Sequence, residues 1–171
     1  MSSMIDKGIL IFLCGKMGAG KSFQSNKLAR NLNAVLISED AWLAAHYTGK
    51  ISSIPDYLHY SALVRPFVRA HVQDILGTGT NVVMDFPANT AVQRAWFRDA
   101  ALEVGAPHRL IYLKADDELC LSQIAKRRRE QPERAAFDNE ETFRKMTRHF
   151  EEPAASEGLE MEAIEQTGRR V

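Results

Sequence analysis

The chain has 171 residues, of which 45% are hydrophobic and 26% are charged, a composition typical of a globular protein and not of a disordered or collagen-like chain. Its 22 Lys and Arg residues balance 22 Asp and Glu residues, so no bulk positive charge attracts it to nucleic acid or to an anionic membrane. We therefore expect one domain over residues 1–171, in which any recognition of phosphate is local.

The two cysteines, Cys14 and Cys120, lie in an apolar run and in a helix-like run, where a small buried side chain is a better interpretation than a disulfide. The apolar run at residues 9–14 is too short to span a membrane or to form the core of a signal peptide. The sequence therefore favours a cytoplasmic protein without membrane association.

Short apolar runs alternate along the chain with longer segments of helical periodicity. The expected strands are residues 8–14, 34–38, 81–85, 109–114 and 159–164. This alternation is typical of βαβ units, and nearly continuous apolar runs are typical of central parallel strands that helices cover on both faces. The predicted fold class is α/β, with three layers, a five-stranded parallel sheet and helices on both faces.

The helices should connect these strands. They are expected at residues 21–32, 56–76, 90–104, 116–128 and 139–150. Proline removes a helix hydrogen bond and clashes with the preceding turn, so we expect a break near residues 63–66, at Pro66. The segment at residues 127–140 is charged and has Phe137 as its only large apolar residue, which makes it a candidate mobile lid.

A G-x-x-x-x-G-K-S motif lies between the first expected strand and the first expected helix, the context of a phosphate-binding P-loop. Its residues are Gly15, Lys16, Met17, Gly18, Ala19, Gly20, Lys21 and Ser22. In such a loop, backbone N–H groups and the helix N-terminus point at phosphate oxygens. Lys21 should reach the β- and γ-phosphates, and Ser22 should bind Mg²⁺. The motif therefore predicts that the chain binds MgATP.

Acidic residues follow two of the expected strands. Asp85 ends an apolar strand and should hold Mg²⁺ directly or through water, the alternative being a turn or cap residue before Pro87. Glu39 and Asp40 follow the second strand, at the edge where open α/β sheets bind ligands. We expect Asp40 to be the base that orients and deprotonates an acceptor hydroxyl. The alternative is that one of these two acids caps the next helix.

These residues resemble a family of P-loop kinases, in which polynucleotide 5'-hydroxyl kinase, zeta toxin, chloramphenicol phosphotransferase and gluconate kinase are grouped with similar small AAA-type ATPases of unknown role. The resemblance covers residues 9–164, and residues 85–90 and 150–158 look like the AAA-type group. It implies that Asp40 is the base and that lid arginines stabilise the transferring phosphate. Arg127, Arg128 and Arg129 occupy that segment, and Arg127 or Arg128 is the expected catalytic arginine. A solvated basic helix end is the alternative.

We therefore expect a phosphotransferase that uses ATP and Mg²⁺ and acts on a hydroxyl of a small molecule or nucleotide. A long nucleic acid is not favoured, because the charge is balanced. An ATP-dependent switch and a polynucleotide 5'-hydroxyl kinase are the alternatives. Several residues suit contact with an anionic or aromatic acceptor, although such residues also occur as core or solvated side chains. They are Arg65, Arg69, Asn89, Arg94, Trp96 and Arg98.

Overall fold

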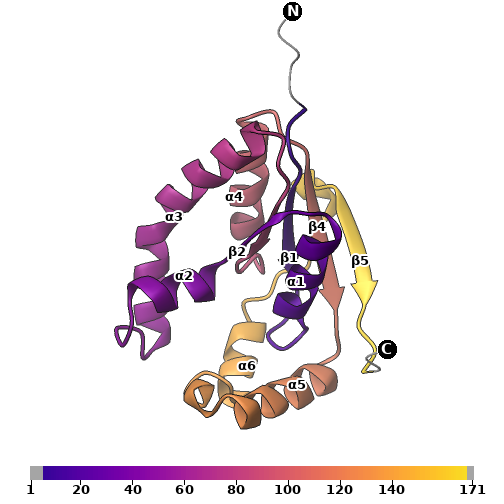
Figure 1. Cartoon of the computed structure of the whole chain (residues 1–171). Helices are drawn as coiled ribbons and strands as arrows, with labels where there is room; N and C mark the ends of the chain where they lie inside the picture. Colours follow the sequence, from indigo (N-terminus) through magenta and orange to yellow (C-terminus); the bar gives the residue numbers. More distant parts are fainter. Residues whose placement is uncertain (1–5, 169–171) are drawn as a thin grey trace, which may run out of the picture.

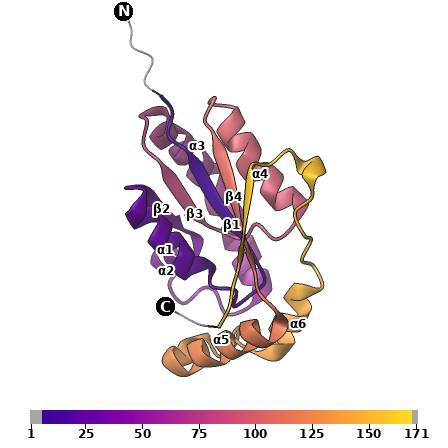
Figure 2. The ribbon, with the colours of Figure 1, turned by 90° about the vertical axis from the view of Figure 1, so that its right-hand side faces the viewer.

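The computed structural model describes residues 6–168, whose strands form a five-stranded sheet in the order β2-β3-β1-β4-β5 (Figures 1 and 2). The strands are β1 (Leu10–Cys14), β2 (Val35–Ser38), β3 (Val82–Asp85), β4 (His108–Lys114) and β5 (Met161–Glu165). All neighbouring strands are parallel. The predicted α/β class and the five parallel strands are confirmed. Residues 1–5 and 169–171 of the expected domain lie outside the described part.

Helices connect the strands and lie on both faces of the sheet. They are α1 (Lys21–Asn31), α2 (Glu39–His46), α3 (Ile54–Gly77), α4 (Ala91–Leu102), α5 (Asp117–Glu130) and α6 (Glu140–Thr147), with the 3-10 turns η1 (Pro132–Arg134) and η2 (Ala155–Glu157). Figure 1 shows α5 and α6 beyond the carboxyl ends of the strands. Between residues 6 and 168, no helix is long and apolar enough to cross a membrane.

The central strand β1 shows how the three layers are built, because all five of its residues are buried. Leu10, Phe12 and Cys14 belong to the core on the side of α3 and α4. Ile11 and Leu13 belong to the core on the side of α1, α5 and α6. Successive residues of a strand point to opposite faces, so a strand covered by helices on both sides is apolar at every position.

The expected break in the long helix at Pro66 is wrong, because α3 is one helix of 24 residues. Pro66 lies on the exposed side of the helix, so water can satisfy the carbonyl group that loses its partner. On the opposite side, Val68, Val72 and Leu76 are fully buried against the sheet. Packing of this buried side maintains the helix through the proline.

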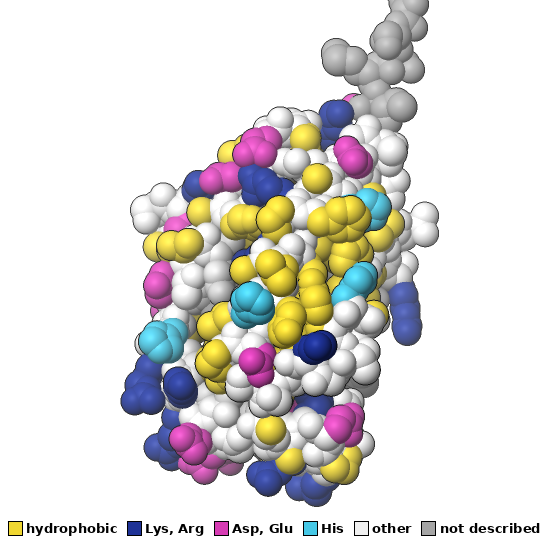
Figure 3. Space-filling view, turned by 90° about the vertical axis from the view of Figure 1, so that its left-hand side faces the viewer, with side chains coloured by type: hydrophobic (Ala, Val, Ile, Leu, Met, Phe, Trp, Pro, Cys, Tyr) yellow, Lys and Arg dark blue, Asp and Glu magenta, His cyan; other side chains and the backbone are white. Residues whose placement is uncertain are grey.

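Rings on the exposed face of α2 and α3 hold the two helices together. Trp42 of α2 lies 6.1 Å from Phe67 and 6.4 Å from His71 of α3, measured between ring centroids. Figure 3 views this side of the molecule and shows hydrophobic side chains gathered in the middle of the face. Offset and tilted aromatic contacts stabilise such a pair of elements. The start of α2, which follows β2, therefore has a fixed position relative to α3.

Candidate active site

The motif at residues 15–22 spans the loop after β1 and the first two residues of α1, the context that it predicts. Gly20 caps α1 with φ 94° and Gly18 has φ 81°, and both values lie in the left-handed region that favours glycine. A Cβ atom on Gly18 would also lie 2.5 Å from the carbonyl oxygen of Cys120 in α5. The loop therefore needs glycine both for its backbone conformation and for its close packing on α5.

Lys21, the first residue of α1, turns its ammonium group toward the loop. Its Nζ donates hydrogen bonds to the carbonyl oxygens of Gly15 at 2.6 Å and of Lys16 at 3.2 Å. Burial lowers the pKa of Lys21, while the carboxylate of Asp85 opposes that shift. Phosphate oxygens in the loop would favour the charged ammonium form and offset its burial. Together with the N-terminus of α1, this makes the loop an anion site.

Asp85 and Ser22 bring two oxygen ligands to the same place. Asp85 ends β3 beside β1, and its side chain lines the same cavity as that of Ser22. Burial raises the pKa of Asp85, and the charges of Asp40 and Glu39 add to that effect, while Ser22 and Lys21 oppose it. A divalent cation would relieve the repulsion among these carboxylates, and Mg²⁺ prefers hard oxygen ligands. The residues present therefore fit the expected Mg²⁺ site.

Two consecutive acids at the start of α2 have different surroundings. Asp40 is exposed and lines the cavity described below, whereas the side chain of Glu39 is buried. Glu39 accepts hydrogen bonds from the hydroxyl of Tyr57 at 2.6 Å and from the hydroxyl of Ser61, and it lies 3.4 Å from Nε of Arg65. Neighbouring helix residues point about 100° apart. Holding Glu39 against α3 therefore turns Asp40 toward the cavity.

Neither acid caps α2, so that alternative interpretation is wrong. Ser38 is the N-cap, and its Oγ accepts a hydrogen bond from the N–H of Ala41 at 3.3 Å. Glu39 and Asp40 occupy the first turn, where negative charge is favourable near the positive end of the helix dipole. Because Ser38 satisfies the helix end, the Asp40 carboxylate is available for chemistry.

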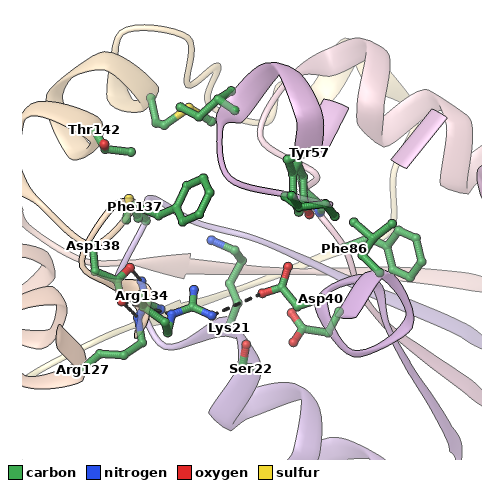
Figure 4. A pocket seen from close by; sticks show the side chains of 18 of the residues that line it. Lys21, Ser22, Asp40, Tyr57, Phe86, Arg127, Arg134, Phe137, Asp138 and Thr142 are labelled. Atoms are coloured by element: carbon green, nitrogen blue, oxygen red, sulfur yellow. Dashed lines mark hydrogen bonds and ion pairs between the residues drawn. The ribbon is translucent and has the colours of Figure 1, made fainter. Parts of the chain in front are cut away.

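The candidate lid at residues 127–140 carries a cluster of ion pairs (Figure 4). Arg127 donates hydrogen bonds to both carboxylate oxygens of Asp138, at 2.7 and 2.5 Å. Arg134 donates to the same carboxylate at 3.1 Å, and its Nη1 lies 4.0 Å from Oδ2 of Asp40. Burial by itself would raise the pKa of Asp138, but the two arginines hold it below its usual range. Asp138 thus holds two cavity-lining arginines together, and one of them, Arg134, lies near Asp40.

Of the two lid arginines expected from the sequence, Arg127 lines the cavity and Arg128 does not. Arg128 is exposed on the outside of α5. Arg134, which sequence reasoning did not single out, lies beside Asp40 instead. Its i, i+4 spacing from Asp138 was the available signal, because this spacing fits a single turn of chain, closed here by the hydrogen bond from the N–H of Asp138 to the carbonyl oxygen of Arg134.

These residues surround one cavity of about 810 Å³. Figure 4 shows Lys21 and Asp40 at its centre, with the lid residues on one side and Tyr57 and Phe86 on the other. Sites for small molecules and cofactors have volumes of roughly 300–1,000 Å³. The cavity has a volume suited to a nucleotide together with a small acceptor.

Most of the side chains suggested for acceptor contact have other partners. Asn89 lines the cavity, but its Oδ1 accepts a hydrogen bond from the N–H of Gly15 at 3.1 Å and so anchors the P-loop. Arg65 also lines the cavity, where its Nε donates to Ser61 at 3.0 Å. The remaining four do not line the cavity, namely Arg69, Arg94, Trp96 and Arg98.

Arg94 has a structural position, because its side chain is completely buried. It donates two hydrogen bonds to the carboxylate of Glu157, at 2.7 and 2.8 Å, and two to the carbonyl oxygens of Ala88 and Glu151. Arg98 donates to the carbonyl oxygen of Glu157 at 2.6 Å. Both arginines therefore hold the segment after α6 against α4, which corrects their expected role in acceptor binding.

Replacing Glu157 with Gln should lower the free energy of unfolding by about 1–3 kcal/mol, because the buried guanidinium of Arg94 loses its charged partner. Urea denaturation measures the change. The matched control is Glu162→Gln on the exposed side of β5, which should change stability by less than about 0.5 kcal/mol. Equal effects of the two substitutions on stability would contradict the structural role of the ion pair between Arg94 and Glu157.

The contribution of Glu157 should also depend on pH. Hydrogen bonds from Arg94 lower the pKa of Glu157 below its usual 4.5, although burial acts in the opposite direction. Because the pKa of Glu157 is lower in the folded than in the unfolded protein, the ionised carboxylate stabilises the fold above pH 4.5. This stabilisation is lost as the pH falls through the pKa of Glu157 in the folded protein. The stability difference between the wild type and Glu157→Gln should therefore shrink in acid, as measured by urea denaturation at several pH values.

Comparisons with known proteins agree with this architecture. Residues 10–153 match a family model described as AAA domain (AAA_33), whereas no curated protein matches the sequence. A candidate kinase from Chloroflexus aurantiacus J-10-fl has a similar structure, with a TM-score of 0.72, 18% identity and coverage of 94% of this chain and 86% of that chain. Kti12 of Chaetomium thermophilum in complex with ADP-AlF3 is also similar, with a TM-score of 0.62, 20% identity and coverage of 90% and 88%.

A gluconokinase from Sinorhizobium meliloti 1021 is a further similar structure, with a TM-score of 0.59 and 15% identity over 96% of this chain and 86% of that chain. All three structures are less than 25% identical to this chain. Their likeness therefore shows a shared fold, because one scaffold can carry many activities.

Proposed function

The chain belongs to the AAA domain family AAA_33, and from this premise we propose that it transfers the γ-phosphoryl group of ATP to a hydroxyl of a small molecule or nucleotide. The observation that carries the proposal is the position of Asp40. Its carboxylate lines the same cavity as Lys21 and lies 4.0 Å from Arg134. A base beside the cationic groups of a phosphate site is the arrangement that phosphoryl transfer to a hydroxyl requires.

In the proposed reaction, the acceptor oxygen forms a bond to the γ-phosphorus, and the bond from that phosphorus to the bridging oxygen breaks. ADP leaves with the electron pair of the broken bond, and the proton of the acceptor hydroxyl passes to Asp40. Lys21 binds the β- and γ-phosphates, while Arg127 and Arg134 stabilise the charge on the transferring group. The products are ADP and the phosphorylated acceptor.

Ser22 and Asp85 would hold Mg²⁺ through a hydroxyl and a carboxylate oxygen. When bound, Mg²⁺ neutralises charge on the β- and γ-phosphates. The side chains of Ser22 and Asp85 both line the same cavity as Lys21. The loop itself aligns the phosphates through its N–H groups, and Asn89 supports the loop by accepting from the N–H of Gly15.

The test follows ADP formation by purified protein with ATP and Mg²⁺, alone and with pools of sugars, nucleosides, aminoglycosides or 5'-hydroxyl oligonucleotides. The proposal expects one pool to raise the rate well above the rate without acceptor. Tight ATP binding with no stimulation by any pool would instead indicate a nucleotide-dependent switch. Stimulation by oligonucleotides alone, with a steep salt dependence, would indicate a polynucleotide 5'-hydroxyl kinase.

Replacing Arg134 with Gln should lower kcat by about 10- to 100-fold, because one of the cations beside the transferring phosphate is lost while Arg127 remains. Arg128→Gln is the matched control, since Arg128 belongs to the same segment and is exposed. Steady-state kinetics with a saturating acceptor measures both variants. If Arg128→Gln were the more damaging substitution, the assignment of Arg134 would be wrong.

A further inference from the structure

The part of the cavity beyond Asp40 has a predominantly apolar wall. Asp40 lies at the start of α2, and the wall continues along α2, the following loop and the first turns of α3. Figure 4 shows Tyr57 and Phe86 on this side, opposite the lid. The main apolar side chains of the wall are Leu43, Tyr47, Ile54, Tyr57, Leu58 and Phe86. We call this part of the cavity the α2–α3 half.

Three of the four hydroxyl-bearing side chains that line the α2–α3 half have partners within the protein, and Tyr47 is the fourth. The hydroxyls of Tyr57 and Ser61 both donate to the buried carboxylate of Glu39. The hydroxyl of Thr48 donates to the carbonyl oxygen of Ala44 at 2.9 Å. The wall therefore presents mainly rings and aliphatic groups to a ligand, since the hydroxyls of Thr48, Tyr57 and Ser61 are turned toward other residues.

Two charged side chains from α2 and α3 line this half, within the described residues. Arg65 is held against α3 by a hydrogen bond from its Nε to Ser61 at 3.0 Å, and its guanidinium lies 5.6 Å from the ring centroid of Trp96. Asp40 has its carboxylate in the cavity, with Arg134 of the lid 4.0 Å away. Asp40 is therefore the group placed to receive a hydroxyl hydrogen bond from the acceptor.

We propose that the acceptor is a small alcohol with a mainly apolar or aromatic body, whose ring or chain packs in the α2–α3 half and whose hydroxyl points at Asp40. This inference rests on the proposed function and names its substrate class. Apolar surface removed from water favours such a ligand. A sugar or polyol would bury more hydroxyl groups than the few polar groups of this wall can pair, and each unpaired hydroxyl lowers the affinity of the ligand about tenfold.

The experiment compares kcat/KM for arylalkyl alcohols with kcat/KM for polyols and sugars of matched size, using the full chain with ATP and Mg²⁺. We expect the aromatic alcohols to be preferred by about tenfold or more. Higher kcat/KM for the polyols or sugars would overturn the inference while leaving phosphoryl transfer to a hydroxyl established.

A matched pair of substitutions on α3 tests the wall itself. Leu58 lines the cavity and is 61% exposed, whereas Leu63 does not line the cavity and is 55% exposed. Leu58→Gln should raise KM for the aromatic alcohol by about three- to tenfold with KM for ATP unchanged, because apolar contact is lost. Leu63→Gln should leave both constants unchanged. An equal change in the two variants would overturn the inference.

Calorimetry separates the inference from the proposed function. The probe is 2-phenylethanol, titrated into the full chain in the presence of a non-hydrolysable ATP analogue and Mg²⁺. Binding that Leu58→Gln weakens and Leu63→Gln does not, without turnover of any acceptor, would support the apolar site and refute phosphoryl transfer. Absence of binding and of turnover for every aromatic alcohol would overturn the inference.

Discussion

Replacing Asp40 with Asn should lower kcat for acceptor phosphorylation by about 10²- to 10⁴-fold and leave the affinity for ATP unchanged. The amide has the size of the carboxylate but cannot accept the proton of the hydroxyl. Asp40 is exposed in the cavity, and its ion partner Arg134 is 4.0 Å away, so the substitution removes little stability. Steady-state kinetics measures kcat, and calorimetry measures ATP binding.

The control for this substitution is Asp74→Asn, on the exposed side of α3. This substitution changes the net charge by the same amount as Asp40→Asn. Asp74 does not line the cavity, so kcat should not change. An Asp40→Asn variant with the kcat of the wild type would exclude Asp40 as the base. It would then favour the nucleotide-dependent switch, which needs no base for an acceptor.

Replacing Lys21 with Ala should lower kcat by about 10²- to 10³-fold and weaken the binding of ATP. Lys21 directs its ammonium group at the P-loop carbonyl oxygens of Gly15 and Lys16, where the phosphates are expected. Its removal takes away the cation that binds the β- and γ-phosphates. Both effects are measured in the same assays as for Asp40→Asn, with a saturating acceptor.

Lys27→Ala is the matched control for Lys21, because Lys27 lies on the same helix and is exposed to solvent. ATP affinity and kcat should remain those of the wild type. Because burial lowers the pKa of Lys21, removing its ammonium group should not cost folding stability. Unchanged ATP binding by Lys21→Ala would contradict the P-loop assignment.

The parts of the fold that depend on local pattern could be predicted from the sequence. The α/β class with its five parallel strands is confirmed, and its clearest local signal is β1, which is apolar throughout and is followed at once by the glycines of the loop. Pro66 shows the limit of local rules. The buried contacts of Val68 and Val72 stabilise α3 through the proline, and their contribution depends on the completed sheet.

In the candidate site, too, local features could be predicted from the sequence, whereas contacts between distant residues could not. The arrangement of Gly18, Gly20 and Lys21 is local, so the motif alone predicts it. The pairing of Arg94 with Glu157 joins residues 63 positions apart, and a single sequence contains no signal for that contact. For this reason the sequence alone places Arg94 among the residues suited to acceptor contact, although its charge is neutralised inside the protein.

The position of β1 at the centre of the sheet has a consequence for folding during synthesis. Strand β1 emerges from the ribosome before its neighbours β3 and β4, which are made much later. The N–H of Gly15 donates a hydrogen bond to Asn89, which is synthesised 74 positions later. Gly18 packs against the backbone at Cys120, which is synthesised later still. Closing such long loops is entropically costly until the partners exist. A nascent chain released as far as α3 therefore carries the whole P-loop motif without the walls that shape it, and affinity for ATP should appear only after α5 has been synthesised.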